Sequence, residues 1–175
     1  MMADQCWGTG FHGRREFLRL SGTALLAAAM PKIALAAEGD FEAMVLACID
    51  PRLQEPVHGY LGRRGLAGKY SQFTIAGAAI GVVAPAFADW HKAFWDNLAA
   101  SVELHGIGKV IAIDHRDCGA AKIAYGPASV ADRDAETRTH REAMARFRAE
   151  LRERQPKLSV ETMLMALDGS VEPLA

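Results

Sequence analysis

The sequence predicts an α/β fold of three layers around a mainly parallel, four-stranded sheet. Two observations support this prediction. Short continuous apolar runs, typical of strands buried on both faces of a parallel sheet, form four segments of the 175-residue chain. Longer segments with helical periodicity connect the later runs, so strands and helices alternate as they do in parallel sheets.

The first two strands are predicted at residues 43–48 and 73–76. They read Ala-Met-Val-Leu-Ala-Cys and Phe-Thr-Ile-Ala, without a charged side chain. A helix over residues 90–105 is predicted to follow, with Asp89 as its cap and Gly106 as its end. Its apolar face is formed by Trp90, Phe94, Leu98 and Val102.

The third and fourth strands are predicted at residues 110–113 and 160–167, the last one ending at an Asp-Gly turn signal. A long helix connects them. It is expected to begin near residues 129–132, where Ser-Val-Ala-Asp resembles a capping box with Asp in place of Glu, and to end near Arg154, before Pro156. Its apolar stripe is narrow, so most of this helix is expected to face water.

Residues 1–36 have the pattern of a twin-arginine export signal rather than of a folded element. The pair Arg14-Arg15 precedes a weakly apolar run over residues 20–29 and a small-residue cleavage site that ends at Ala36. This order predicts a periplasmic or otherwise exported protein, whose one domain spans residues 37–175. The alternative is an ordinary amphipathic helix with an incidental arginine pair.

Charge and hydropathy exclude two classes of partner. The chain has 20 Lys and Arg against 21 Asp and Glu, a formal net charge of −1, and no basic stripe that suggests nucleic acid. No stretch after residue 36 approaches the roughly 20 apolar residues of a transmembrane helix. The mature form is therefore expected to bind neither nucleic acid nor a membrane.

Two short clusters carry the chemistry of the chain. Cys48, Asp50 and Arg52 end the first predicted strand, and His115 and Cys118 follow the third. Ligands collect at the carboxyl ends of parallel strands, so a strand order 2-1-3-4 would bring the clusters together. Two thiolates and one imidazole are three ligands for a soft-to-borderline metal, with a fourth position left for chemistry. The set predicts a catalytic Zn²⁺ site.

Two other interpretations of the cysteines remain open. Cys48 and Cys118 are the only cysteines after residue 36, and an exported protein would by default pair them in a disulfide. The twin-arginine signal weakens this default, because it resembles the route for folded, cofactor-loaded proteins. A thiol/disulfide protein, with His115 tuning thiol reactivity, is one alternative. A zinc-binding protein without turnover is the other.

The chain resembles the beta-carbonic anhydrases. Their Cys-x-Asp-x-Arg motif is matched by Cys48, Asp50 and Arg52, and their His-x-x-Cys-Gly motif by His115, Cys118 and the glycine that follows. The resemblance implies one Zn²⁺ per chain on Cys48, His115 and Cys118, and a catalytic pair of Asp50 and Arg52. It also implies hydration of CO2 to bicarbonate and assembly into a homodimer or a larger oligomer.

One segment departs from that family. Typical members continue the second strand with Arg-Asn-Ala-Gly, whereas residues 75–79 here read Ile-Ala-Gly-Ala-Ala. This apolar exit predicts a more hydrophobic pocket, which could also suit hydrolysis of carbonyl sulfide or carbon disulfide. If Arg52 releases Asp50, that carboxylate could become a fourth zinc ligand and close the site.

Several other polar residues invite functional interpretations. Asp114 and Asp117 flank His115 and either orient its ring or cap the next helix. Glu136 and His140 have helical ligand spacing but are interpreted as a solvated pair. The remaining histidines of the domain are interpreted as ordinary surface or core residues rather than proton shuttles; they are His58, His91 and His105.

Overall fold

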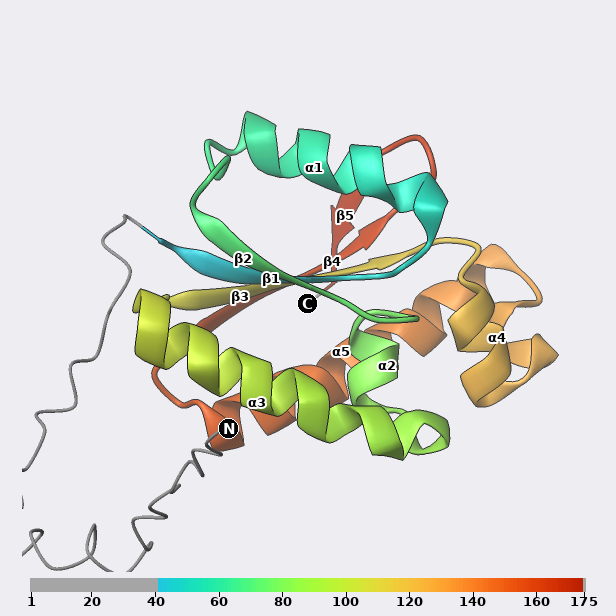
Figure 1. The fold of residues 1–175 in the computed structure, drawn as a ribbon. Coiled ribbons are helices and arrows are strands. Elements are labelled where there is room, and N and C mark those ends of the chain that lie inside the picture. The colour runs from blue at the N-terminus through green and yellow to red at the C-terminus, as the bar shows by residue number, and fades with distance from the viewer. Residues whose placement is uncertain (1–40, 175) are drawn as a thin grey trace, which may run out of the picture. The chain divides into compact units, whose positions relative to one another are not determined.

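The computed structural model describes residues 41–174, which form a sheet with helices on both faces (Figure 1). The predicted α/β class and the parallel order β2-β1-β3-β4 are confirmed. The parallel strands are β1 (Ala43–Ala47), β2 (Tyr70–Thr74), β3 (Lys109–His115) and β4 (Ser159–Met165). The predicted count of four is wrong, because β5 (Val171–Pro173) adds an antiparallel edge strand beside β4.

Alternation along β1 divides the core into two parts. Met44, Leu46 and Cys48 contribute to a cluster on one face of the sheet, whereas Ala43 and Val45 belong to a second cluster on the other. Every residue of β1 is buried, as expected for a central parallel strand. The end of β1 therefore delivers Cys48 into the interior rather than to the surface.

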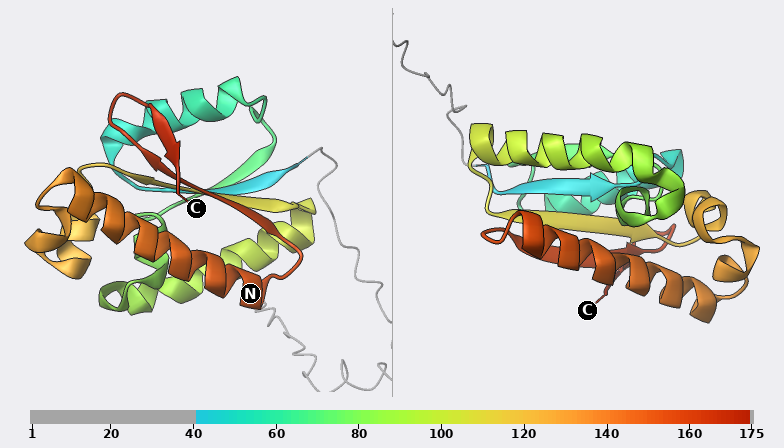
Figure 2. Two further views of the ribbon diagram at one scale, coloured as in Figure 1. Left: turned by 180° about the vertical axis from the view of Figure 1, so that it is seen from behind. Right: turned by 90° about the horizontal axis from the view of Figure 1, so that it is seen from below.

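Helices cover the two faces unequally. Helix α1 (Gln54–Arg63) lies alone on one face, while α2 (Ala79–Val83), α3 (Ala88–His105) and α5 (Arg133–Arg154) lie on the other (Figure 1). Seen from that side, α3 and α5 run side by side across the sheet (Figure 2). Helix α4 (Gly119–Tyr125) and three short 3-10 turns complete the elements of residues 41–174. The turns are Pro51–Leu53, Pro85–Phe87 and Pro127–Val130.

The ends of the two long helices agree only partly with the sequence. Gly106, with φ of 63°, ends α3 as predicted, but α3 begins at Ala88 without a side-chain cap, so Asp89 is not its N-cap. Asp132 caps α5 by accepting from the Ala135 N–H at 2.7 Å. The buried face of α5 is wider than its apolar residues indicate, because Glu136 is also buried.

The predictions for residues 1–36 lie outside the described residues. Among residues 41–174, no helix is both long and apolar enough to cross a membrane.

The turn between β2 and α2 is tightly packed beside Cys48. Gly77 has φ of 81° and Ala78 φ of 48°, so two successive residues have left-handed φ values. A methyl group added at Gly81, in α2, would lie 2.4 Å from the carbonyl oxygen of Ala76. The Ala76 carbonyl oxygen and the Ile75 side chain thus leave no room for a larger residue at position 81.

Gly81→Ala is therefore expected to destabilise the protein by about 1–3 kcal/mol, because the new methyl group must displace backbone. Gly62→Ala is the matched control. Nothing lies within 4 Å of an added methyl group there, and replacing a helical glycine with alanine is expected to stabilise by about 0.5 kcal/mol. Urea midpoints of both variants test the pair, and equal midpoints would contradict the tight packing at Gly81.

Candidate metal centre

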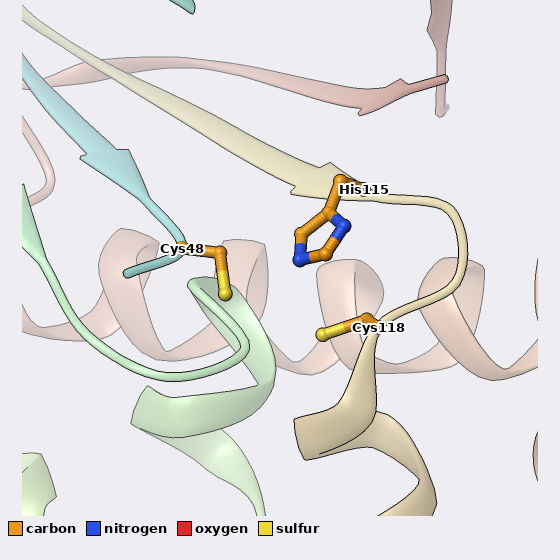
Figure 3. A group of neighbouring side chains, drawn as sticks. All are labelled: Cys48, His115 and Cys118. Atoms are coloured by element: carbon orange, nitrogen blue, oxygen red, sulfur yellow. The ribbon is translucent and has the colours of Figure 1, made fainter. Parts of the chain in front are cut away.

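Three side chains from three elements converge at one edge of the sheet (Figure 3). Cys48 follows β1, His115 is the last residue of β3, and Cys118 is the N-cap residue of α4. Strands β1 and β3 are adjacent and parallel, with Ala47 opposite Ile113, so they end together. One ligand atom from each of the three residues lies within 4.8 Å of the others.

The short link between His115 and Cys118 reverses the chain through a left-handed residue. Asp117 has φ of 56°, a conformation that Asp tolerates better than most side chains do. Its backbone N–H donates to the carboxylate of Glu136 on α5, which anchors the turn from outside. This anchoring returns Cys118 toward His115.

A backbone carbonyl sets the orientation of the His115 ring. His115 Nδ1 donates to the carbonyl oxygen of Arg116 at 2.8 Å, which leaves Nε2 with its lone pair. The residue is 1% exposed, and Nε2 has no hydrogen-bond partner among residues 41–174. A buried, unpaired ring nitrogen beside two cysteines is the arrangement that a metal ion would satisfy.

The two thiols have opposite proton affinities because they share one site. A hydrogen bond from Cys118 lowers the pKa of Cys48 to about 4, and the same contact, together with burial, raises the pKa of Cys118. The Gly77 N–H also donates to the Cys48 sulfur, at 3.2 Å. Burial alone would lower the pKa of His115, but the Cys48 thiolate, the Arg116 carbonyl and the Asp50 carboxylate together outweigh burial and raise it.

This donor set fits a metal of the zinc type. Zinc accepts thiolates at about 2.3 Å and imidazole nitrogen at about 2.0–2.1 Å in tetrahedral sites, and three protein ligands leave one position open. Cys48 and Cys118 are both free thiols rather than a disulfide. We conclude that Cys48, His115 and Cys118 form a cluster able to hold a metal ion.

Asp50 and Arg52 form a two-pronged ion pair beside the cluster. Arg52 donates from Nε to Asp50 Oδ1 at 3.0 Å and from Nη2 to Oδ2 at 2.7 Å. The backbone N–H of Arg52 also donates to Asp50 Oδ1, so Asp50 caps the 3-10 turn that follows β1. These donors lower the pKa of Asp50 to about 2, so its carboxylate is ionised at any physiological pH.

A second carboxylate holds Arg52, a role that motif spacing does not indicate. Arg52 Nη1 donates to Asp117 Oδ2 at 2.7 Å, and Nη2 donates to the Asp117 carbonyl at 3.1 Å. The guanidinium thus ties the segment after β1 to the turn between His115 and Cys118. Neither interpretation of Asp117 is right, because its side chain neither orients the His115 ring nor caps α4.

Asp114 has neither of its two predicted roles, because it does not orient the His115 ring and does not cap α4. It accepts instead from the Ala79 N–H and from His140 Nδ1, both inside the core. Glu136 pairs with Arg116, so the predicted solvated pair of Glu136 and His140 is wrong. The other histidines contact residues away from the cluster: His58 meets Tyr70, His91 meets Ala84 and His105 meets Ser71.

A cavity of about 660 Å³ opens beside the cluster. Asp50 and Cys118 line it together, so the ion pair and one candidate ligand face the same space. The expected hydrophobic pocket is not found there, since most of the residues that line the cavity are charged. The other lining residues are Arg52, Arg116, Asp117, Gly119, Lys122, Val130, Asp132, Arg133 and Glu136.

Sequence comparison relates the chain to known proteins over nearly all described residues. A family described as putative carbonic anhydrase matches residues 37–174. Two uncharacterized proteins, from Rickettsia conorii and Rickettsia bellii, are each 30% identical to the chain over 131 residues. The match covers 75% of this chain and 70% and 80% of the two relatives, respectively.

Structure comparison identifies the same fold in solved proteins. The beta-carbonic anhydrase CcaA matches with a TM-score of 0.54 and 14% identity, covering 79% of this chain and 82% of that chain. The beta-carbonic anhydrase CafA of Aspergillus fumigatus matches with a TM-score of 0.52 and 18% identity, covering 80% and 78%. At these identities the likeness concerns the fold alone.

The hydrogen bond between Cys118 and Cys48 predicts how the Cys48 thiol titrates in the metal-free protein. A depressed pKa means that the Cys48 thiolate is present at neutral pH and protonates only as the pH falls through about 4, whereas an ordinary thiol titrates near 8.5. Thiolate absorbance in a Cys6→Ser background should therefore report about one thiolate per chain at pH 7. Denaturation should abolish it, and a folded protein without thiolate at pH 7 would refute the shared site.

Proposed function

The chain belongs to the beta-carbonic-anhydrase-like family, and on that premise we propose that it is a zinc-dependent enzyme that interconverts carbon dioxide and bicarbonate. One observation carries the proposal. The Cys48, His115 and Cys118 cluster lies beside an ionised carboxylate that a guanidinium grips with two hydrogen bonds. A structural zinc site would use a fourth protein ligand and has no need of this neighbour.

Zinc is the proposed metal, at one ion per chain. Two thiolates neutralise its charge, and His115 presents the Nε2 lone pair because Nδ1 is occupied by a carbonyl. When bound, zinc supplies a Lewis acid that lowers the pKa of water to about 7 and so provides a nucleophile at neutral pH.

Asp50 is proposed to orient the nucleophile. An ionised carboxylate only accepts hydrogen bonds, and the pKa of Asp50, about 2, keeps it in this form. It can accept a hydrogen bond from the attacking water and direct a lone pair of the oxygen toward the carbon of CO2. Arg52 keeps the carboxylate in place, and the reaction consumes one CO2 and one water to give bicarbonate and a proton.

A second substrate class rests on the apolar turn at residues 75–79, which lies behind Cys48 and does not line the charged cavity. Ala78 and Ala79 are fully buried beside Cys48, and the only polar group that the turn offers to the sulfur is the Gly77 N–H. Carbonyl sulfide and carbon disulfide are more hydrophobic electrophiles that the same attack would hydrolyse. Carbon dioxide remains the first choice on the strength of the family.

Assembly and location extend the proposal. Ile49 and Ile123, on the segments that follow Cys48 and Cys118, are 58% and 73% exposed. Apolar side chains this exposed beside the site favour burial against a second copy of the chain, in a homodimer or a larger oligomer.

The twin-arginine pattern in residues 1–36 supports export to the periplasm.

Asp50→Ala is expected to retain zinc and to lose CO2 hydration activity by about 100-fold or more, as when a positioned acid–base group is removed. Asp96→Ala is the control, because Asp96 only pairs with Lys92 on the exposed face of α3. Stopped-flow assays with a pH indicator, together with zinc analysis of the same samples, measure both quantities. Full activity of Asp50→Ala would remove this residue from the mechanism.

Cys48→Ser is expected to lose the metal itself, because a serine hydroxyl is a far poorer zinc ligand than a thiolate. Elemental analysis should find about one zinc per wild-type chain and almost none in the variant. Wild-type protein that holds zinc but converts neither CO2 nor carbonyl sulfide would instead identify a zinc-binding protein without turnover.

A further inference from the structure

A buried aspartate–histidine pair lies behind the metal centre and has no part in the proposed reaction. His140, on α5, donates from Nδ1 to Asp114 Oδ2 at 2.8 Å. Both side chains have no solvent exposure. Polar groups this deep are costly to bury unless each finds partners, so their presence in an otherwise apolar core calls for a reason.

The other oxygen of Asp114 is directed to a different element. Asp114 Oδ1 accepts from the backbone N–H of Ala79 at 2.9 Å, at the first residue of α2. One carboxylate on β3 therefore connects α5 to the turn between β2 and α2. These are three elements that the chain does not join directly.

The turn between β2 and α2 contacts the metal centre through one backbone amide. The N–H of Gly77 donates to the Cys48 sulfur at 3.2 Å, two residues before Ala79. The turn is held in an unfavourable shape, since Ala78 has φ of 48° and ψ of −112°. A non-glycine residue keeps such a conformation only where its surroundings enforce it, and Asp114 grips the very next N–H.

We propose that Asp114 and His140 are positioning residues of the metal centre: they hold residues 77–79 so that the Gly77 N–H points at the Cys48 sulfur. A hydrogen bond to a thiolate ligand withdraws electron density from sulfur and tunes its bond to the metal. The pair thus acts on the metal through an apolar turn whose own side chains offer no polar group. This inference rests on the ligand role of Cys48 within the proposed function, and it requires no particular substrate.

His140→Leu and His140→Asn separate positioning from simple core packing. Leucine fills the space but leaves Asp114 without its side-chain donor, whereas the asparagine amide can place an N–H near the position of Nδ1. Phe147→Leu is the matched control. Phe147 is equally buried on α5, but it lies about two helical turns from His140 and packs against Phe94 and Trp95.

The first readout is the sulfur-to-metal charge-transfer band of the full chain loaded with Co²⁺. Loss of the Gly77 hydrogen bond makes the thiolate easier to oxidise, so His140→Leu should move the band to lower energy. It should also weaken zinc binding about ten-fold, as measured by competition with a chelator, because the Cys48 sulfur is no longer held in its binding position. His140→Asn should restore both values toward wild type, and Phe147→Leu should change neither, although it unfolds earlier.

The second readout needs no metal. Amide hydrogen exchange in the metal-free chain should be at least about ten-fold faster at Gly77 and Ala79 in His140→Leu, and unchanged at both in Phe147→Leu. Should His140→Leu fail to fold, Asp114→Asn, which keeps the volume but removes the charge, is expected to shift both readouts in the same direction by less.

Exchange at Gly77 that matches wild type in a folded variant would overturn the positioning role, as would an unmoved charge-transfer band. A wild-type chain that binds neither cobalt nor zinc would defeat the proposed function. The exchange experiment would still decide in that case whether the pair holds the turn.

Discussion

The pairing of β1 with β3 is the constraint on which the site depends. The two strands are parallel and in register, so their carboxyl ends stop at the same edge although 67 positions separate Cys48 from His115. A slip of one residue in this register would reverse the face that each side chain occupies. Burial of both faces of β1 specifies the register, because its alternate residues serve two different apolar clusters. The geometry of the cluster is thus a product of core packing.

Ion pairs then hold the segments that leave this edge. Arg52 connects the segment after β1 to Asp117, and Asp117 is tied through its backbone N–H to Glu136 on α5. Glu136 in turn pairs with Arg116, which also contacts Glu172 on β5. Burial opposes the charge of Arg116, yet the two carboxylates outweigh burial and raise its pKa. Ion pairs linked through the Asp117 backbone N–H therefore form a continuous frame from the candidate catalytic pair to the edge of the sheet.

The parts of this architecture that sequence could predict are those encoded locally. Apolar runs located β1, β3 and β4, whereas the predicted run at residues 73–76 overlaps β2 only at Phe73 and Thr74, because this partly exposed strand begins with polar residues. Motif spacing identified the residues that meet at the strand ends. Strand β5 was missed because its three residues include a proline and a glutamate, and α1 because it buries only Val57 and Leu61. Glu136 and His140 were misjudged for a different reason: their partners lie on β3 and on the turn that follows it, and helical spacing carries no information about such distant carboxylates and guanidiniums.

Arg52 is paired with both Asp50 and Asp117, and this second partner affects whether Asp50 can move to a bound metal. Release of Asp50 breaks its side-chain hydrogen bonds from Arg52, a cost that would be largest if the guanidinium were left alone. Asp117 prevents that outcome, because it still accepts from Nη1 through its carboxylate and from Nη2 through its carbonyl. The Arg52 cation therefore keeps partners whichever way Asp50 turns. If Asp50 turns to a bound metal, as the sequence predicts, Asp117 therefore lowers the free-energy cost of that movement and keeps Arg52 where Asp50 can return to it.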